Sequence, residues 1–107
     1  MADDRSDDVR DDALDLFAEL RAFGLEAETP LGTAVEKMSA ILFKTDAEDG
    51  TVKVHMTATG SLTRVEFRNH AFRRHDEQSL ALTLVETIRK AEDVARVAAG
   101  FVRGNER

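Results

Sequence analysis

Six basic side chains in the second half of the chain have the chemistry to bind phosphate groups: Lys53, His55, Arg64, Arg68, Arg73 and Arg74. Charged N–H donors bind phosphate oxygens with an affinity that falls with salt and carries little sequence information. In an antiparallel pair of strands the first four of these positions can share one open face. The sequence therefore predicts a candidate polyanion-binding surface. The alternative is a solvated sheet face crossed by pairs such as Glu66 with a neighbouring arginine, because no aromatic residue is interleaved for base stacking.

The charge is distributed unevenly along the 107 residues, whose net charge is −6. Residues 1–50 contain 5 basic and 14 acidic residues, whereas residues 51–107 contain 10 basic and 7 acidic ones. A mildly basic C-terminal half can present a positive face to a polyanion while the acidic half keeps the protein soluble. Two solvated helix faces would give the same composition.

Three histidines, His55, His70 and His75, are the remaining candidates for chemistry. His70 and His75 share one polar segment with Asp76, but no sulfur ligand and no helical pair at i, i+4 supports a metal site. The serines and histidines occur without a nucleophile elbow, an oxyanion loop or an evident buried carboxylate partner. We expect no catalytic residue, no metal and no cofactor, and so no enzyme activity.

A predicted β-hairpin must position the basic side chains. Residues 51–59 alternate, with Val52, Val54, Met56 and Ala58 on one side, which predicts a strand with one buried face. Gly60 and Ser61 favour a turn, and Leu62, Val65 and Phe67 follow as a second strand. Leu62 and Val65 are three residues apart, so all three face the core only if a bulge lies near the turn. Phe72 is expected to anchor the connector after the hairpin, residues 68–75.

The N-terminal half is predicted to add a helix and a further strand. Apolar residues at steps of three and four predict an amphipathic helix from about Asp7 to Phe23, ending near Gly24. Pro30 predicts a break, after which residues 33–38 form a short helix. Residues 39–45 favour a first strand by their branched and aromatic content, although they could also end the preceding helix, which leaves residues 25–45 open between helix and strand.

A long C-terminal helix starts at His75 or Asp76. Its apolar stripe becomes rich in alanine towards its end and is formed by Leu80, Leu84, Ile88, Ala91, Ala95, Ala98 and Val102. Small residues allow close approach of another helix, within the chain or from a second copy. An intertwined or edge-paired homodimer would use the open sheet edge, or Leu84, Ile88, Ala91 and Ala95.

The whole chain, 1–107, is expected to form one α+β domain: an N-terminal helix, a three-stranded antiparallel sheet and a long C-terminal helix. Residues 1–6 and 103–107 are expected to be disordered. The sequence has no cysteine, an acidic N-terminus and no apolar run of membrane-spanning length. A cytoplasmic location without membrane contact is the matching expectation.

Between Asp49 and about Ala95 the chain resembles the YbaB/EbfC family of bacterial nucleoid-associated proteins. The resemblance lies in Asp49-Gly50 before Val52-x-Val54, in Gly60-x-Leu62-x-x-Val65-x-Phe67, in Phe72-Arg73-Arg74, and in Asp76-x-x-x-Leu80-x-x-x-Leu84-Val85-x-x-Ile88-x-x-Ala91. It implies a tightly associated homodimer that binds DNA with little sequence preference and has no catalytic motif. The preference for Arg over Lys and the alanine content suggest an actinobacterial-type member.

The chain departs from this family pattern in its N-terminal half. Pro30 and Gly32 interrupt what is usually one long helix, and acidic residues replace the usual Lys, Gln and Met. Some actinobacterial relatives are linked to specialised protein secretion. A protein–protein adaptor built on the same dimeric scaffold, with no DNA binding, is therefore the second functional hypothesis.

Overall fold

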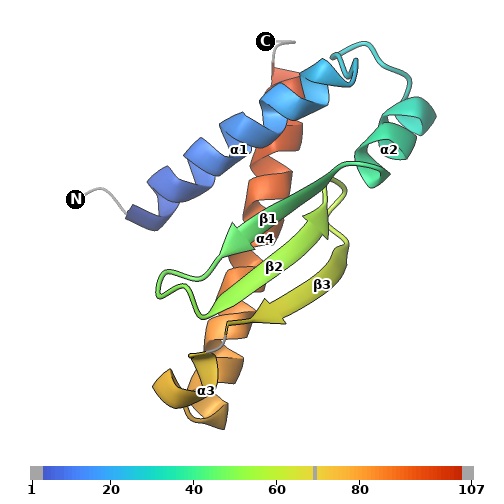
Figure 1. Cartoon of the computed structure of the whole chain (residues 1–107). Coiled ribbons are helices and arrows are strands. Elements are labelled where there is room, and N and C mark those ends of the chain that lie inside the picture. Colours follow the sequence, from blue (N-terminus) through green and yellow to red (C-terminus); the bar gives the residue numbers. More distant parts are fainter. Residues whose placement is uncertain (1–3, 69, 105–107) are drawn as a thin grey trace.

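The predicted α+β fold is confirmed by a computed structural model, which describes residues 4–68 and 70–104. Two long helices and a three-stranded sheet form the body, and two short helices flank the sheet (Figure 1). In chain order the elements are α1 (Asp4–Ala22), α2 (Leu31–Ser39), β1 (Leu42–Asp46), β2 (Val52–Thr57), β3 (Leu62–Phe67), α3 (Ala71–Arg74) and α4 (Glu77–Gly104).

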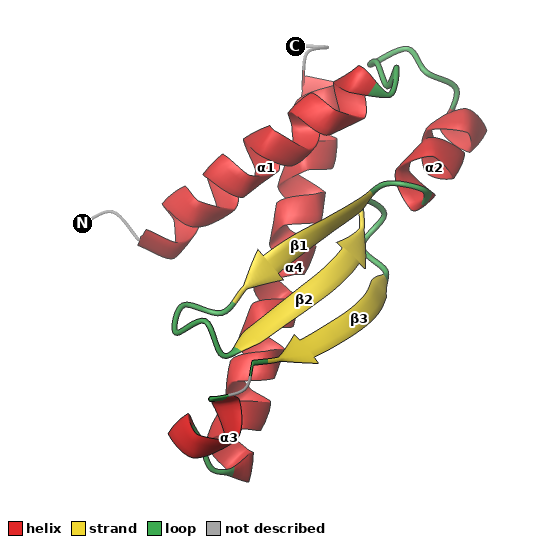
Figure 2. Cartoon of the chain, in the orientation of Figure 1, coloured by secondary structure: helices red, strands yellow, loops and turns green. Residues whose placement is uncertain are grey.

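The sheet is an antiparallel meander of order β1-β2-β3 with β2 at its centre. Figure 2 shows one face of the sheet lying against α4. The predicted inner face of β2 is buried, since Val52 and Val54 are fully buried and Met56 is 1% exposed. Alternation along β2 therefore predicted correctly which side chains form the core.

The predicted bulge lies beside the second turn. His55 pairs with Arg64, but the next residue, Met56, pairs with Leu62, so Thr63 is the extra residue of β3. Both sheet turns contain a glycine in the left-handed region, Gly50 at φ 74° and Gly60 at φ 93°. Residues other than glycine rarely adopt this backbone conformation, which explains why both turns contain a glycine.

The long helix α4 joins two apolar clusters. In one of them the part of α4 from Leu80 to Ala91 packs against the inner face of the sheet. In the other its C-terminal half packs against α1, where Ala13, Val94 and Ala98 are fully buried. Small residues at this crossing let the two helices approach closely. The predicted helix–helix contact is thus made within the chain.

Residues 25–45, for which the sequence left helix and strand open, form a turn, the helix α2 and the strand β1. Gly24, at φ 89°, follows α1, and the chain then turns back so that Leu25 is buried and its N–H bonds to the Leu20 carbonyl. Pro30 directly precedes α2, as the break predicted, and β1 starts only at Leu42. The strand is therefore shorter at its start than the predicted 39–45.

Several expectations for individual side chains were wrong. Leu62 and Phe67 are 47% and 43% exposed, because β3 is the edge strand and only Val65 faces the covered centre of the sheet. Phe72 is 71% exposed, and Ala71, fully buried, anchors the connector instead. Thr51, which the alternation of residues 51–59 places on the side opposite Val52, is buried.

Both ends of the described chain are helical further than expected. Asp4 begins α1 and Gly104 ends α4, inside the segments 1–6 and 103–107 that we expected to be disordered. Residues 1–3 and 105–107, which carry the rest of that prediction, lie outside the described residues.

Candidate nucleic-acid interface

The outer face of the sheet carries a row of three basic residues. Lys44 of β1 pairs with His55 of β2, which in turn pairs with Arg64 of β3, so the row crosses all three strands. No described element covers this face in Figure 2. Lys44 was missed by the sequence analysis because only the pairing of β1 with β2 brings it beside His55.

A second row on the same face is of mixed charge. Asp46 pairs with Lys53, and Lys53 pairs with Glu66. Cross-strand neighbours of opposite charge offset each other, so Lys53 offers a phosphate less than Lys44 or Arg64 does. Of the two rows, the one with Lys44 and Arg64 therefore carries the larger positive charge.

His55 is already engaged within the face. Its Nε2 contacts Glu66 Oε2, and this hydrogen bond is the main cause that lowers the pKa of Glu66. In the part of the chain that the structure describes, Lys44 and Arg64 have no ion-pair partner. These two side chains are the cations of the row without an ion pair, although the charge of Arg64 also contributes to lowering the pKa of Glu66.

The other three candidates lie beyond β3. Arg68 Nη2 is 3.5 Å from Asp46 Oδ1, so its charge is partly offset. Arg73 and Arg74 are exposed on α3, at the end of the sheet where α4 begins (Figure 1), and neither has an ion-pair partner among the described residues. The candidates thus form two groups, one on the sheet and one on α3.

A polar network that the sequence analysis missed joins the β1–β2 turn to the start of α4. His75 Nε2 is 2.6 Å from Asp49 Oδ2, and His75 Nδ1 contacts Ser79 Oγ at 2.5 Å. The other oxygen of Asp49 accepts hydrogen bonds from the amide and the hydroxyl of Thr51, at 3.0 and 2.6 Å. The Thr51 hydroxyl is the first cause, and His75 a further one, that lowers the pKa of Asp49 to about 2.

The sequence showed no evident buried carboxylate partner for a histidine, and in the structure the carboxylate partner of His75 is Asp49, whose side chain is 26% exposed. A serine, a histidine and an aspartate lie in the order of a nucleophilic relay, but such a relay also needs a substrate site beside the serine. Asp49 lines a surface pocket together with Thr83, but His75 and Ser79 do not line it. The arrangement joins the β1–β2 turn to the start of α4.

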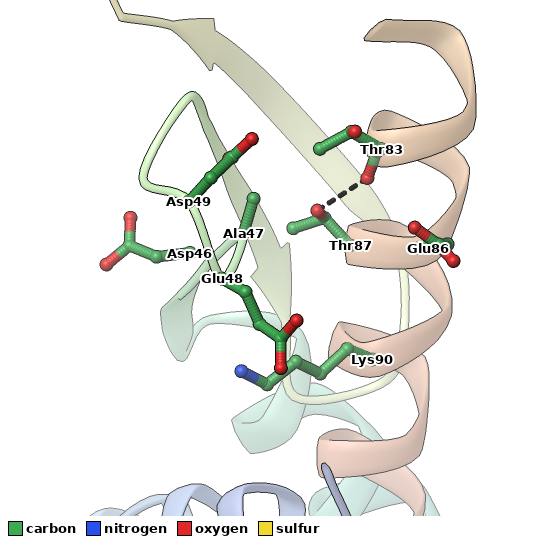
Figure 3. Close-up of a pocket in the computed structure, with 8 residues that line it drawn as sticks. All are labelled: Asp46, Ala47, Glu48, Asp49, Thr83, Glu86, Thr87 and Lys90. Atoms are coloured by element: carbon green, nitrogen blue, oxygen red, sulfur yellow. Dashed lines mark hydrogen bonds between the residues drawn. The ribbon is translucent and has the colours of Figure 1, made fainter. Parts of the chain in front are cut away.

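That pocket is open, has a volume of about 450 Å³ and lies between the β1–β2 turn and α4 (Figure 3). Carboxylates outnumber cations in its lining, which consists of Asp46, Ala47, Glu48, Asp49, Thr83, Glu86, Thr87 and Lys90. Its negative charge repels phosphate. A polyanion on this molecule is therefore directed to the basic row and away from the turn.

The predicted dimer-interface stripe lies largely inside the chain. Ala91 is fully buried and Ala95 is 5% exposed, while Leu84 and Ile88 are half-buried against the sheet cluster. In this fold the two alanines have no surface left for a second copy. Large exposed apolar side chains occur instead on β3, α3 and the exposed side of α4, namely Leu62, Phe67, Phe72, Leu82 and Val85.

Residues 4–68 and 70–104 contain neither a metal-binding cluster nor a membrane-spanning helix. No three His, Asp or Glu side chains there gather closely enough to hold a metal ion. None of the described helices combines the length and the apolar character that crossing a membrane requires.

Comparison with known proteins agrees with this architecture. Residues 25–100 match the model of the YbaB/EbfC DNA-binding family. An uncharacterized protein from Helicobacter pylori has a similar crystal structure, with a TM-score of 0.61 at 13% sequence identity, covering 71% of this chain and 88% of that one. This likeness concerns the fold alone. No curated protein sequence matches the chain. Because the family model spans more than half of its residues, the chain belongs to the YbaB/EbfC DNA-binding family.

Proposed function

We propose that the chain acts as a homodimer that binds duplex DNA with little sequence preference, as a nucleoid-associated protein. The observation that carries the proposal is the uncovered basic row of Lys44, His55 and Arg64 across the sheet. A face of this kind offers charged donors to phosphates but no helix or aromatic group to read base edges.

The chemistry of binding is electrostatic. On the sheet, Lys44 and Arg64 donate hydrogen bonds to phosphate oxygens of the DNA. On α3, Arg73 and Arg74 extend this contact beyond β3. Binding releases counterions, so affinity falls steeply as salt rises. The acidic pocket and the acidic outer residues of α1 limit the surface over which DNA lies.

The dimer supplies the second set of contacts. The β3 edge has unpaired backbone groups and lies near exposed apolar side chains, which a second copy would cover. Two-fold symmetry then doubles the basic surface. Such a protein works where the chromosome lies, in the bacterial cytoplasm.

The test is a fluorescence-anisotropy titration of random-sequence duplex DNA at two salt concentrations. Lys44→Glu/Arg64→Glu reverses two charges of the row, and Arg89→Glu/Arg103→Glu makes the same charge change at exposed positions of α4. We expect the sheet variant to weaken binding by about tenfold or more and to reduce the salt slope, because phosphate contacts are lost. Equal weakening in the α4 variant, or no binding by micromolar wild-type protein at low salt, would overturn the proposal.

An adaptor function is the second candidate, and the exposed face of α2 favours it. Leu31 and Val35, one helical turn apart, are 79% and 47% exposed. Together with the acidic N-terminal half they suit a protein partner, for example in a secretion system of the actinobacterial type. Affinity capture from a native lysate with Leu31→Ser/Val35→Ser as control tests this: a reproducible partner lost in the variant supports the adaptor, and nucleic acid alone counts against it.

A further inference from the structure

We propose that His75 is a positioning residue for DNA binding. Its imidazole joins α3 to the β1–β2 turn and to α4, and thereby fixes where Arg73 and Arg74 meet the phosphates. The inference rests on the proposed DNA-binding function. In that function His75 itself does not contact DNA.

The helix α3 cannot hold its own orientation. It is a single turn of four residues, Ala71–Arg74, far shorter than an isolated helix needs for stability in water. Its orientation therefore depends on contacts with the rest of the chain. Ala71 is fully buried in the sheet cluster, and the ring of Phe72 lies 5.8 Å from that of Phe67.

His75 supplies the remaining anchor, directly after the two arginines. Its backbone N–H caps α3 by donating to the Ala71 carbonyl at 3.0 Å, and its side chain is only 13% exposed. Both ring nitrogens are engaged, Nε2 with Asp49 and Nδ1 with Ser79. The imidazole thus joins the segment between α3 and α4 to the β1–β2 turn, 26 residues earlier in the sequence, and its contact with Ser79 is local to the start of α4.

The anchor is itself rigid. Asp49 is held by two hydrogen bonds from Thr51, a residue that is fully buried, and Ser79 lies in the first turn of α4. A neutral imidazole satisfies both contacts, with Nε2–H donating to the Asp49 carboxylate and Nδ1 accepting from the Ser79 hydroxyl. A fixed end of α3 reduces the conformational entropy that the two arginines lose when they bind phosphates.

The experiment is a double-mutant cycle on DNA affinity, measured by fluorescence anisotropy with random-sequence duplex. His75→Ala is combined with Arg73→Gln/Arg74→Gln, and His70→Ala removes the exposed histidine at the other end of α3 as a control. In the wild-type background we expect His75→Ala to weaken binding about 3- to 10-fold, because two side chains lose their pre-organisation. In the Arg73→Gln/Arg74→Gln protein, His75→Ala should change the DNA affinity by less than about twofold.

Two further measurements separate positioning from general loss of structure. His75→Gln, which keeps an N–H donor near the Asp49 carboxylate, should recover part of the affinity. In DNA-free His75→Ala, amide hydrogen exchange should speed up at Arg74 and at position 75, whose N–H groups bond to the carbonyls of His70 and Ala71, and stay unchanged in β2.

The outcomes discriminate between the two proposals. If wild-type protein binds DNA but His75→Ala weakens binding equally in both backgrounds, or Arg73→Gln/Arg74→Gln binds like wild type, the positioning role is overturned and DNA binding stands. If the wild-type protein binds no DNA at low salt, both are overturned.

Discussion

Asp49 is a residue whose charge is closely linked to the fold. Both of its oxygens are used, Oδ1 by Thr51 and Oδ2 by His75. Its pKa is lowered from 3.8 to about 2, chiefly by the Thr51 hydroxyl. Because the pKa is lower in the folded than in the unfolded chain, the ionised carboxylate stabilises the fold above pH 4. That contribution is lost as the pH falls from about 4 through 2.

Asp49→Asn should therefore lower the free energy of unfolding by about 1–2 kcal/mol at pH 7, since charged hydrogen bonds are lost. Urea unfolding followed by circular dichroism between pH 7 and pH 2 measures the difference. It should shrink below pH 4 and be small at pH 2, where the wild-type carboxyl is about half protonated and most of the stabilisation by its ionised form is lost. Glu48→Gln, the same charge change at the exposed neighbour, should have little effect at any pH. A difference for Asp49→Asn that is constant over the whole range would contradict the assignment.

Thr45 is a second residue with a clear energetic signature. Its side chain is 2% exposed, and its hydroxyl has no hydrogen-bond partner among the described residues. Thr45→Val, a change of nearly equal shape that suits a strand, should raise the free energy of unfolding by about 1 kcal/mol. Thr57→Val is the matched control on β2. The Thr57 hydroxyl accepts the Ser61 N–H at 3.1 Å and shares a bond with Thr59, so this variant should lose about 1 kcal/mol. Equal effects in chemical denaturation would contradict the prediction.

At the scale of single residues, the local sequence pattern predicted the core residues well but did not predict the polar contacts. Alternation alone identified Val52, Val54 and Met56 as buried, because each residue's side of a strand follows from its position. Asp49 and His75 are 26 residues apart, and no spacing rule connects them. Their contact depends on how α4 starts relative to the first sheet turn, which only the assembled fold determines.

At the scale of elements, the predictable features were those with a local cause. The bulge followed from the three-residue step between Leu62 and Val65, and the break before α2 followed from Pro30. The exposure of Leu62 and Phe67 has no local cause. Alternation shows which face of β3 a residue occupies, but not whether α4 extends far enough to cover it. The same limit hid Lys44, whose place beside His55 depends on strand pairing.

Two glycines test the helix and turn assignments in opposite directions. Gly100 is exposed within α4, and a Cβ there would meet nothing within 4 Å. Gly100→Ala should stabilise the protein by about 0.5–1 kcal/mol, because alanine favours the helix and reduces the freedom of the unfolded chain. Gly60 also has open space, but its φ of 93° suits glycine, so Gly60→Ala should destabilise the fold by about 1 kcal/mol. Thermal unfolding of both variants measures these changes in stability. A shift of the melting temperature in the same direction for both would argue against these backbone conformations.

At the scale of the whole molecule, the distribution of surfaces matters more than any single contact. The basic row occupies the open face of the sheet, and half of the ten large apolar side chains that are exposed among the described residues lie on β3, α3 and the outside of α4. A soluble monomer rarely leaves large contiguous apolar areas open, and an unpaired edge strand invites pairing. A second copy on the β3 side would place two basic rows on one particle, and DNA would then bind both at once.

Dimerisation and DNA affinity should accordingly fall together. Leu82 and Val85, three residues apart on α4 and 61% and 43% exposed, are replaced in Leu82→Ser/Val85→Ser without removing any buried side chain. We expect this variant to shift from dimer to monomer in size-exclusion chromatography with light scattering at micromolar concentration. Its affinity for a random duplex long enough to contact both subunits should drop by about tenfold or more, because bivalent contact is lost.

The matched control is Leu31→Ser/Val35→Ser on α2, which removes a similarly exposed apolar pair from the opposite end of the sheet and should leave both the mass and the DNA affinity unchanged. A duplex too short to reach the second subunit provides the internal check. Wild-type protein and the monomeric variant should bind it with similar strength, because each subunit keeps its own Lys44 and Arg64. If the control variant dissociates instead, the interface lies at α2. If the monomer binds long DNA as tightly as the dimer does, one subunit makes all the contacts and the second copy serves the fold alone.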